Sequence, residues 1–320
     1  MSGDEPDIVV RQEGVHGIAT SEYAAALRER LPEYDVRLAR TPAEERELIP
    51  YARVVAGKTI DEDLLDRAEN LELLACSFAG YGHLPMDAIE GHGVSVTTAS
   101  GVHGPNIAED VLGHLLTLTR RHHEGWRRQQ NREWRAYPTR EFAGSTVTVA
   151  GLGALGSAVV ERLQGFDVDT IGIRHSPEKG GPTDEVVGPD RLHEALARTD
   201  HLVLTVPLTD ETEGMIGEAE FTTLPPDATI VNVARGPVVD TTALVSAVRS
   251  NDIGGAALDV TDPEPLPEDH PLWGFENVLI TPHNAGNTPK YYERLADILA
   301  ENLRRVADTG EYNGLKNQVA

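Results

Sequence analysis

The sequence predicts an α/β protein with two doubly wound parallel-sheet domains, Rossmann-like or flavodoxin-like, and a cleft between them. Its 320 residues suffice for about two domains of ordinary size. Short runs rich in Val, Ile and Leu alternate with helical patterns, which is typical of parallel sheets covered by helices. This alternation occurs twice, before and after one long helical stretch, so each series is expected to form its own sheet.

The first series occupies about the first hundred residues. Its strand candidates are DIVV (7–10), VRLA (36–39), ARVVAG (52–57), LELLACSFAG (71–80) and VSVTTA (94–99). Between them, helices are expected over 21–31, with Ser21 as the N-cap, and over 60–70. The single cysteine, Cys76, lies in the fourth run, so we expect a buried strand residue rather than a nucleophile.

A helix is expected from about Asn106 to Arg128, directly after Pro105, and leads into a segment that contains Trp and Arg. A second alternating series follows, and a last helix is expected over about 289–306. The strand candidates of this series are TVTVAG (146–151), VDTIGIR (168–174), HLVLTVP (201–207), TIVNVA (229–234), GGAALDV (254–260) and NVLIT (277–281). Six strands are enough for a complete doubly wound domain.

The first turn of the second series fits the pattern G-x-G-x-x-G at Gly151, Gly153 and Gly156. The pattern alone is weak, but it stands here between a strand and a helix, with the next strand at the expected distance. Gly151 would allow a tight turn, Gly153 the close approach of a pyrophosphate, and Gly156 close packing of helix on strand. The setting therefore predicts a dinucleotide site, and a plain glycine turn is the alternative.

The end of the next strand indicates which dinucleotide binds. A carboxylate there would bind the ribose hydroxyls of NAD, but the sequence has Arg174, His175 and Ser176. An arginine pairs well with the 2′-phosphate of NADP, and the serine adds a further donor. We therefore expect NADP (NADPH) to be preferred, with NAD as the weaker cofactor; the alternative is an exposed loop arginine.

Three later strands each end at a polar group: Arg235, Glu264 and His283. Parallel strands place their carboxyl ends at one edge of the sheet, so these groups are expected to meet there. An arginine can orient the carboxylate or carbonyl of a 2-oxoacid, and a histidine can protonate the carbonyl oxygen as hydride arrives. The glutamate would hold the imidazole. No Cys or His spacing resembles a zinc site, so no metal is expected.

These segments together resemble the D-isomer-specific 2-hydroxyacid dehydrogenase family, which contains D-lactate, D-glycerate/hydroxypyruvate, D-3-phosphoglycerate, formate and phosphite dehydrogenases. The catalytic candidates are 29 and 19 positions apart, as in that family. The matching segments are CSFAGYGHLP, PNIAEDVLGHLL, VAGLGALGSAVVERL, TVPLTDETEGMI, VNVARGPVVD, ALDVTDPEPLP and NVLITPHNAG, in family order from about residue 70 to 290.

The resemblance implies a discontinuous substrate domain, residues 1–100 plus 288–320, and a dinucleotide-binding domain, residues 101–287. It implies substrate contacts at Arg235 and His283 and at the backbone of Ala79 and Gly80. It also implies a homodimer joined through the cofactor domain, by way of 106–145. Further cofactor contacts are implied at Leu155, Val206, Pro207, Thr212, Val233, Ala234, Asp259, His283 and Ala285.

Two positions depart from the family pattern. Arg174 stands where many members have aspartate, and Gly82 stands where many have aspartate in the substrate turn. The second departure loosens any transfer of substrate preference. Within 106–145, a basic cluster at 120–123 and 127–128 is read as a helix face with ion pairs to nearby acids rather than as an anion site.

The function expected from these residues is reversible reduction of a small 2-oxoacid to the D-2-hydroxyacid with NADPH, with His283 as the acid/base. Two alternatives stay open. One is a cofactor-sensing binding protein, as in the co-repressor branch of the same family. The other is an oxidative enzyme of the formate or phosphite dehydrogenase type. The physiological 2-oxoacid is not indicated by the sequence.

Charge narrows the possible partners. The chain has 28 Lys and Arg against 52 Asp and Glu, a net charge of −24. Such a surface repels phosphate backbones, so nucleic acid is not expected as a partner. Neither a basic leader nor an apolar run of membrane-spanning length is seen, and we expect a cytoplasmic protein without membrane contact. The scattered acids favour a salt-adapted (halophilic) source over an ordinary acidic enzyme.

Overall fold

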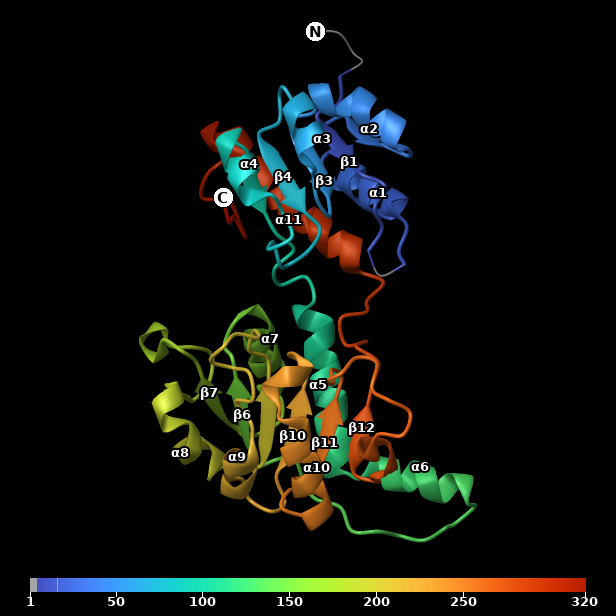
Figure 1. Ribbon diagram of the computed structural model, residues 1–320, viewed down its shortest axis with the longest axis vertical. Coiled ribbons are helices and arrows are strands. Elements are labelled where there is room, and N and C mark those ends of the chain that lie inside the picture. Colours follow the sequence, from blue (N-terminus) through green and yellow to red (C-terminus); the bar gives the residue numbers. More distant parts are fainter. Residues whose placement is uncertain (1–4, 16) are drawn as a thin grey trace. The chain divides into compact units, whose positions relative to one another are not determined.

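The computed structural model describes residues 5–15 and 17–320. Its contacts divide the chain into two compact units, Met1–Val102 with Asn287–Ala320, and His103–Gly286. Each unit contains one parallel sheet with helices on both faces, which confirms the predicted fold class (Figure 1). None of the helices in the described ranges is long and apolar enough to cross a membrane.

The first unit is built on a five-stranded sheet in the order β2-β1-β3-β4-β5, with every neighbouring pair parallel. Alternate strand residues face opposite sides and both sides are buried, as in sheets covered by helices. The strands are β1 (Ile8–Val10), β2 (Val36–Leu38), β3 (Val54–Gly57), β4 (Leu73–Cys76) and β5 (Ser95–Thr97). The helices are α1 (Thr20–Arg30), α2 (Pro42–Leu48), α3 (Glu62–Arg67), α4 (Met86–Gly91) and α11 (Tyr291–Thr309).

Helix α11 comes from the far end of the chain and packs beside α1 on one face of this sheet (Figure 1). Tyr292 of α11 stacks on Tyr23 of α1, with 5.1 Å between ring centroids. The final residues extend the same unit, because Val319 N–H donates to Val96 O at 2.9 Å. The C-terminal segment therefore belongs to the core of the first unit.

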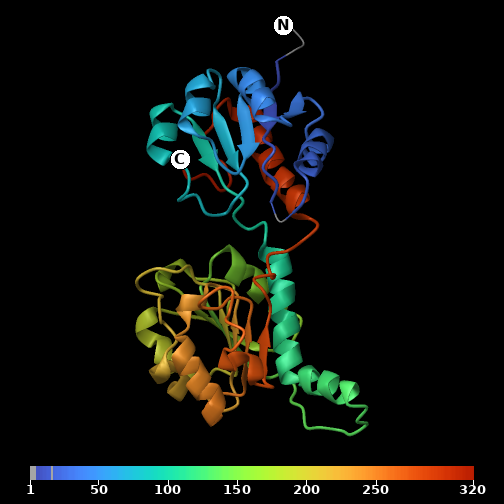
Figure 2. The same ribbon diagram turned by 45° about the vertical axis from the view of Figure 1, so that its right-hand side comes forward.

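The second unit is built on a seven-stranded parallel sheet in the order β12-β11-β10-β9-β6-β7-β8. Helix α5 runs along one face together with α7 (Figure 2), and α8, α9 and α10 cover the other. The strands are β6 (Thr146–Ala150), β7 (Asp169–Ile173), β8 (Glu185–Val187), β9 (His201–Leu204), β10 (Thr229–Asn232), β11 (Gly255–Leu258) and β12 (Val278–Ile280). The helices are α5 (Gly104–Thr119), α6 (His122–Gln130), α7 (Ala154–Leu163), α8 (Leu192–Leu196), α9 (Glu218–Thr223) and α10 (Thr241–Ser250).

Two helix predictions were wrong in detail. The first helix begins at Thr20 with Ala19 as its N-cap, so Ser21 lies inside the helix and caps nothing. The single helix expected over 106–128 is two helices, because Arg121 has a left-handed backbone (φ 52°) that interrupts the helical hydrogen bonds. The apolar face of α5 ends at Leu118. Residues beyond it contribute no apolar side chain to this core, so burial does not favour extending α5 along the sheet.

Candidate functional site

The glycine turn after β6 has the geometry that a dinucleotide phosphate requires. Gly151 has φ +98°, and a Cβ there would lie 2.9 Å from the Thr205 carbonyl carbon. A Cβ on Gly156 would lie 1.8 Å from Gly151 O, so only glycine allows α7 to pack this closely. A Cβ on Gly153 would meet no atom within 4 Å, and no side chain caps the N-terminus of α7. The first-turn N–H groups of α7 therefore remain for an anion, which fits a pyrophosphate.

The segment after β7 presents the groups predicted to read the ribose. Arg174 is partly buried, and its Nη1 donates to Gly180 O. His175 is exposed, and its Nδ1 lies 3.4 Å from Glu211 Oε2. Ser176 precedes the 3-10 turn Pro177–Lys179, and its carbonyl accepts from Lys179 N–H at 3.2 Å. Sequence reasoning did not assign Lys179, although it lies in the same loop as Arg174.

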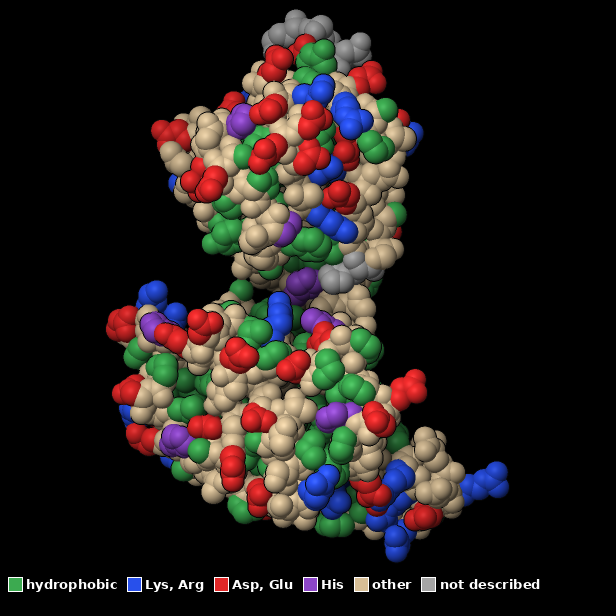
Figure 3. Space-filling view, viewed as in Figure 1, with side chains coloured by type: hydrophobic (Ala, Val, Ile, Leu, Met, Phe, Trp, Pro, Cys, Tyr) green, Lys and Arg blue, Asp and Glu red, His purple; other side chains and the backbone are tan. Residues whose placement is uncertain are grey.

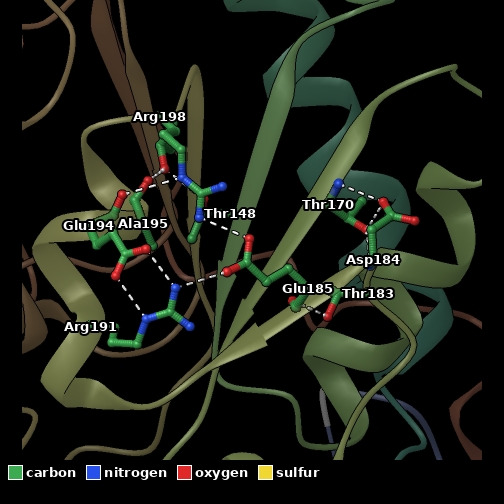
Figure 4. A network of polar contacts seen from close by, with 10 residues as sticks. Thr148, Thr170, Thr183, Asp184, Glu185, Arg191, Glu194, Ala195 and Arg198 are labelled. Carbon is green, nitrogen blue, oxygen red and sulfur yellow. Dashed lines mark hydrogen bonds and ion pairs between the residues drawn. The ribbon is translucent and has the colours of Figure 1, made fainter.

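This loop is held by β8, the edge strand (Figure 4). The Asp184 carboxylate accepts from Thr170 N–H at 2.8 Å and from Thr170 Oγ1 at 2.7 Å. These hydrogen bonds lower the pKa of Asp184. Glu185 accepts from Arg191 at 3.3 Å and from Arg198 at 2.9 Å, so the strand is also tied to the residues that flank α8. The loop that carries Arg174 is thus anchored at its far end.

Arg235 lies in the turn after β10, beyond Val233 and Ala234, and is exposed. Its Nη1 donates to Ala234 O at 2.6 Å, and its own carbonyl accepts from Asn232 Nδ2 at 3.0 Å. Asn232 Oδ1 also accepts from Ala234 N–H at 3.0 Å. In the described part of the chain no carboxylate pairs with Arg235, so its guanidinium is available to an anionic ligand. Asn232, which positions this turn, was not foreseen from the sequence.

Glu264 and His283 lie together as the strand-end pattern predicts. His283 Nδ1 donates to Glu264 Oε2 at 2.9 Å, and Glu264 Oε1 accepts from Thr261 N–H at 3.1 Å. With Nδ1 bound to the carboxylate, Nε2 of the imidazole is the nitrogen left for a ligand. His283 has a left-handed backbone, φ 51°, so the loop around it must be held by other contacts.

Asp259 supplies those contacts. It is 3% exposed, and its backbone carbonyl accepts from His283 N–H at 2.8 Å. Its Oδ1 accepts from Thr281 Oγ1 and Asn284 N–H, both at 2.7 Å, and its Oδ2 accepts from Ala285 N–H at 3.0 Å. The family resemblance implied a cofactor contact for this residue; the structure shows an additional role, which is to fix the histidine loop.

The remaining cofactor candidates lie at strand ends of the same sheet. Thr212 Oγ1 donates to Pro207 O at 2.6 Å and closes the loop after β9, while Val206 is partly buried at its start. Leu155 lies in the first turn of α7, partly buried against the α5 side of the core. The buried candidates are Val233, Ala234 and Ala285.

Ala79 and Gly80 lie in the first unit, in the exposed turn after β4. Among the described residues, their backbone N–H groups have no hydrogen-bond acceptor. Cys76 ends β4 and is buried, and burial raises the pKa of its thiol. The prediction of a buried strand cysteine is therefore confirmed. In the predicted basic cluster, Arg127 and Arg128 pair with Glu124, so the expectation of ion pairs is confirmed for 127–128.

The chain is similar to known proteins over most of its length. Residues 112–285 match the family model described as D-isomer specific 2-hydroxyacid dehydrogenase, NAD binding domain. A glyoxylate reductase of Thermofilum pendens is 37% identical over 254 residues, 76% of this chain and 74% of the relative. A solved D-isomer specific 2-hydroxyacid dehydrogenase of Xanthobacter autotrophicus, in complex with NADPH and MES, is 31% identical with a TM-score of 0.76 and covers 99% of this chain and 98% of that one. A family protein of Aeromonas salmonicida is 26% identical with a TM-score of 0.77 and covers 99% of each chain.

Proposed function

Because the chain belongs to the D-isomer-specific 2-hydroxyacid dehydrogenase family and is thus an NAD(P)-dependent dehydrogenase, we propose that it reduces a small 2-oxoacid to the D-2-hydroxyacid with NADPH. The hydrogen-bonded pair of Glu264 and His283 at a strand end of the cofactor sheet carries the proposal. It gives the unit with the dinucleotide-type glycine turn a proton donor and a group that orients it.

In the proposed reaction, His283 is the acid. A protonated imidazole donates from both nitrogens, so Nε2 can give its proton to the carbonyl oxygen while Nδ1 stays bound to Glu264. The nicotinamide cofactor, when bound, supplies hydride to the carbonyl carbon, and the product is the alcohol. Arg235 binds the substrate through the guanidinium donors that Ala234 O does not occupy, and the N–H groups of Ala79 and Gly80 bind the carboxylate.

The cofactor is proposed to lie along the carboxyl ends of the strands in the second unit. The pyrophosphate binds at Gly151, Gly153 and Gly156, and Asp259 binds the nicotinamide amide in addition to fixing its loop. The other contacts proposed along the dinucleotide are Leu155, Val206, Pro207, Thr212, Val233, Ala234, His283 and Ala285.

Preference for NADPH over NADH is proposed from Arg174, His175 and Ser176. The bond from Arg174 to Gly180 O holds the guanidinium in place and leaves other N–H donors for a 2′-phosphate. Calorimetry with adenosine 2′,5′-bisphosphate and adenosine 5′-phosphate tests this without turnover. Arg174→Ala should raise Kd for the bisphosphate by about tenfold or more and leave Kd for the monophosphate nearly unchanged. Turnover with NADH tenfold better than with NADPH would overturn the preference.

A homodimer is proposed through the segment 106–145 of the second unit. Trp126 and Trp134 are exposed there, by 57% and 103%, and such aromatic side chains are typical of interface anchors. A cavity of about 500 Å³ lies beside this segment, with His123 and Arg140 in its lining. Sedimentation should show a dimer that Trp134→Ser weakens and the exposed-aromatic control Tyr51→Ser does not. A monomer at micromolar concentration would contradict the proposal.

The proposed surroundings are the cytoplasm, with a small-molecule partner and no nucleic acid or membrane. The acidic composition supports the absence of nucleic acid binding. Retention of labelled duplex DNA at low salt, or recovery of the protein in a membrane fraction, would contradict these proposals.

The decisive test of the mechanism is the variant His283→Ala in an NADPH oxidation assay with a panel of 2-oxoacids. General acid catalysis contributes on the order of 10²- to 10⁴-fold, so kcat should fall by that factor. Binding of NADPH, followed by its fluorescence, should weaken far less than kcat falls, because the other proposed dinucleotide contacts are kept and His283 is exposed. Full turnover by His283→Ala would overturn the assignment.

A further inference from the structure

Lys58 lies in the loop after β3 of the first unit, against the turn that contains Ala79 and Gly80. Its ammonium is 5.6 Å from the centroid of the Phe78 ring. Its backbone carbonyl accepts from His83 Nε2 at 2.8 Å and from Cys76 Sγ at 3.4 Å. These contacts hold the Lys58 loop against both ends of the turn.

Lys58 has no acidic partner among the residues that the structure describes. The chain has only four lysines among its 28 basic residues and 52 acids to pair them with. Within residues 5–15 and 17–320, no carboxylate lies within 4.0 Å of the Lys58 ammonium, although the side chain is partly buried. Partial burial of an ammonium costs free energy, and the face of a phenylalanine ring offsets only part of that cost. An anionic ligand would offset the rest.

The adjacent turn is a separate place for an anion. The backbone N–H groups of Ala79, Gly80 and Gly82 have no acceptor among the described residues. A Cβ on Gly80 or Gly82 would meet no atom within 4 Å, so a ligand can approach this backbone. Successive free N–H groups in a turn bind carboxylates and phosphates. The loop and the turn therefore offer two neighbouring sources of positive potential on one unit.

We propose that Lys58 binds a second anionic group of the substrate. The preferred 2-oxoacid would then carry a terminal carboxylate or phosphate besides the carboxylate next to its carbonyl. This inference rests on the proposed function, in which the N–H groups of the turn and Arg235 already serve the first carboxylate. Lys58 is left as an additional cation, and a dianion matches it in charge.

The experiment compares kcat/KM for substrates of similar size. Oxaloacetate carries a terminal carboxylate, 3-phosphooxy-2-oxopropanoate carries a terminal phosphate, and 4-methyl-2-oxopentanoate replaces the carboxylate of oxaloacetate by an isopropyl group. Each is measured with the wild type, Lys58→Met and Lys58→Arg. Lys316→Met is the matched control, because Lys316 pairs with Glu301 at 2.6 Å on an exposed surface and its loss changes the net charge equally.

Lys58→Met should lower kcat/KM for the better of the two dianions by about tenfold or more, mainly through KM. The same variant should change kcat/KM for the branched monoacid by less than about twofold. Lys58→Arg should keep most of the preference for the dianion over the branched monoacid. The dianion that loses more identifies the terminal group. An unchanged preference, or equal loss with all three substrates at an unchanged melting temperature, would overturn the inference while leaving the proposed function standing. Absence of turnover of every 2-oxoacid by the wild type would overturn both.

Discussion

Asp259 shows at the scale of a single residue how the catalytic loop is held. His283 has a left-handed backbone conformation (φ 51°), which costs on the order of 1–3 kcal/mol for a residue other than glycine. Three donors from 281–285 converge on the buried carboxylate of Asp259. Their combined hydrogen bonds offset the strain and fix the imidazole beside Glu264.

Replacing Asp259 by Asn should therefore affect both stability and catalysis. One acceptor oxygen becomes an NH₂ group that faces an N–H or O–H donor inside the loop, and an unpaired donor of this kind costs about 1–3 kcal/mol where it is buried. The free energy of unfolding, measured by chemical denaturation, and kcat should both fall in Asp259→Asn. Neither should fall in Asp252→Asn, which changes an exposed aspartate of the same unit. Equal behaviour of the two variants would mean that Asp259 does not hold the loop.

His201 is a second residue whose environment is decisive. It is 6% exposed at the start of β9, its Nδ1 hydrogen-bonds with Thr229 Oγ1 at 2.8 Å, and burial lowers its pKa from 6.5 to about 4. The folded protein thus binds the proton less readily than the unfolded chain. The unfolded chain therefore takes up a proton at His201 before the folded protein does. The contribution of the neutral His201 to the free energy of unfolding is complete above pH 6.5 and is lost as the pH falls toward 4.

The lowered pKa of His201 corresponds to about 3 kcal/mol of unfolding free energy, at roughly 1.4 kcal/mol per pKa unit. The free energy of unfolding of the wild type should therefore fall more steeply between pH 6.5 and 4 than that of His201→Asn. The asparagine keeps a group for Thr229 but takes up no proton. Parallel pH profiles of the two proteins would show that His201 does not titrate in this way.

At the scale of elements, the strand candidates of the sequence were found because parallel strands are buried on both faces and read as apolar runs. β8 was missed: it has three residues at the sheet edge, and only Val187 among them is buried. The break between α5 and α6 was also missed, because the residues at the break are Arg120 and Arg121 and no Gly or Pro marks it. The glycine turn and the Glu264–His283 pair were predictable because short spacings and strand ends determine them.

What the sequence could not reveal are the contacts that hold those residues. The convergence of Thr281, Asn284 and Ala285 on Asp259 depends on the exact path of the loop. The sequence also does not show that the Lys58 ammonium lies beside the Phe78 ring, with no carboxylate of the described residues within 4.0 Å. Such contacts join segments without a periodic pattern, and no spacing rule describes them.

The edge strand β8 gives a prediction at this scale. The carboxylate of Asp184 accepts two hydrogen bonds from Thr170, which lower its pKa and clamp β8 to β7 (Figure 4). A lowered carboxyl pKa stabilises the fold at neutral pH, and this stabilisation is lost as the pH falls through that lowered value. Asp184→Asn should therefore melt at a lower temperature than the wild type at pH 7, with a gap that closes in acid. A gap that widens in acid would contradict the clamp.

At the scale of the whole molecule, the charge of −24 is spread over the surface. The acidic side chains in Figure 3 are scattered over both units, and basic ones gather around α6. The proposed cofactor and substrate are themselves anions, so this field opposes their approach at low salt. The cations proposed to bind them, Arg174 and Arg235, act over short distances that salt screens less.

Salt should therefore assist cofactor binding. KM for NADPH should fall as KCl rises from about 0.1 M toward 1 M, because the Debye length shrinks from about 10 Å to about 3 Å. An uncharged osmolyte at equal osmolality should not reproduce the effect. A KM that rises with KCl would count against both the screening argument and the salt-adapted source that the composition favours.

The central claim is NADPH-dependent reduction of a 2-oxoacid to the D-hydroxyacid. Its most direct measurement is the consumption of NADPH with a panel of 2-oxoacids, followed by chiral chromatography of the product. The account predicts that NADPH is consumed in step with formation of the D-enantiomer alone. Formation of the L-enantiomer, or no NADPH consumption with any 2-oxoacid, as the cofactor-sensing alternative predicts, would contradict it.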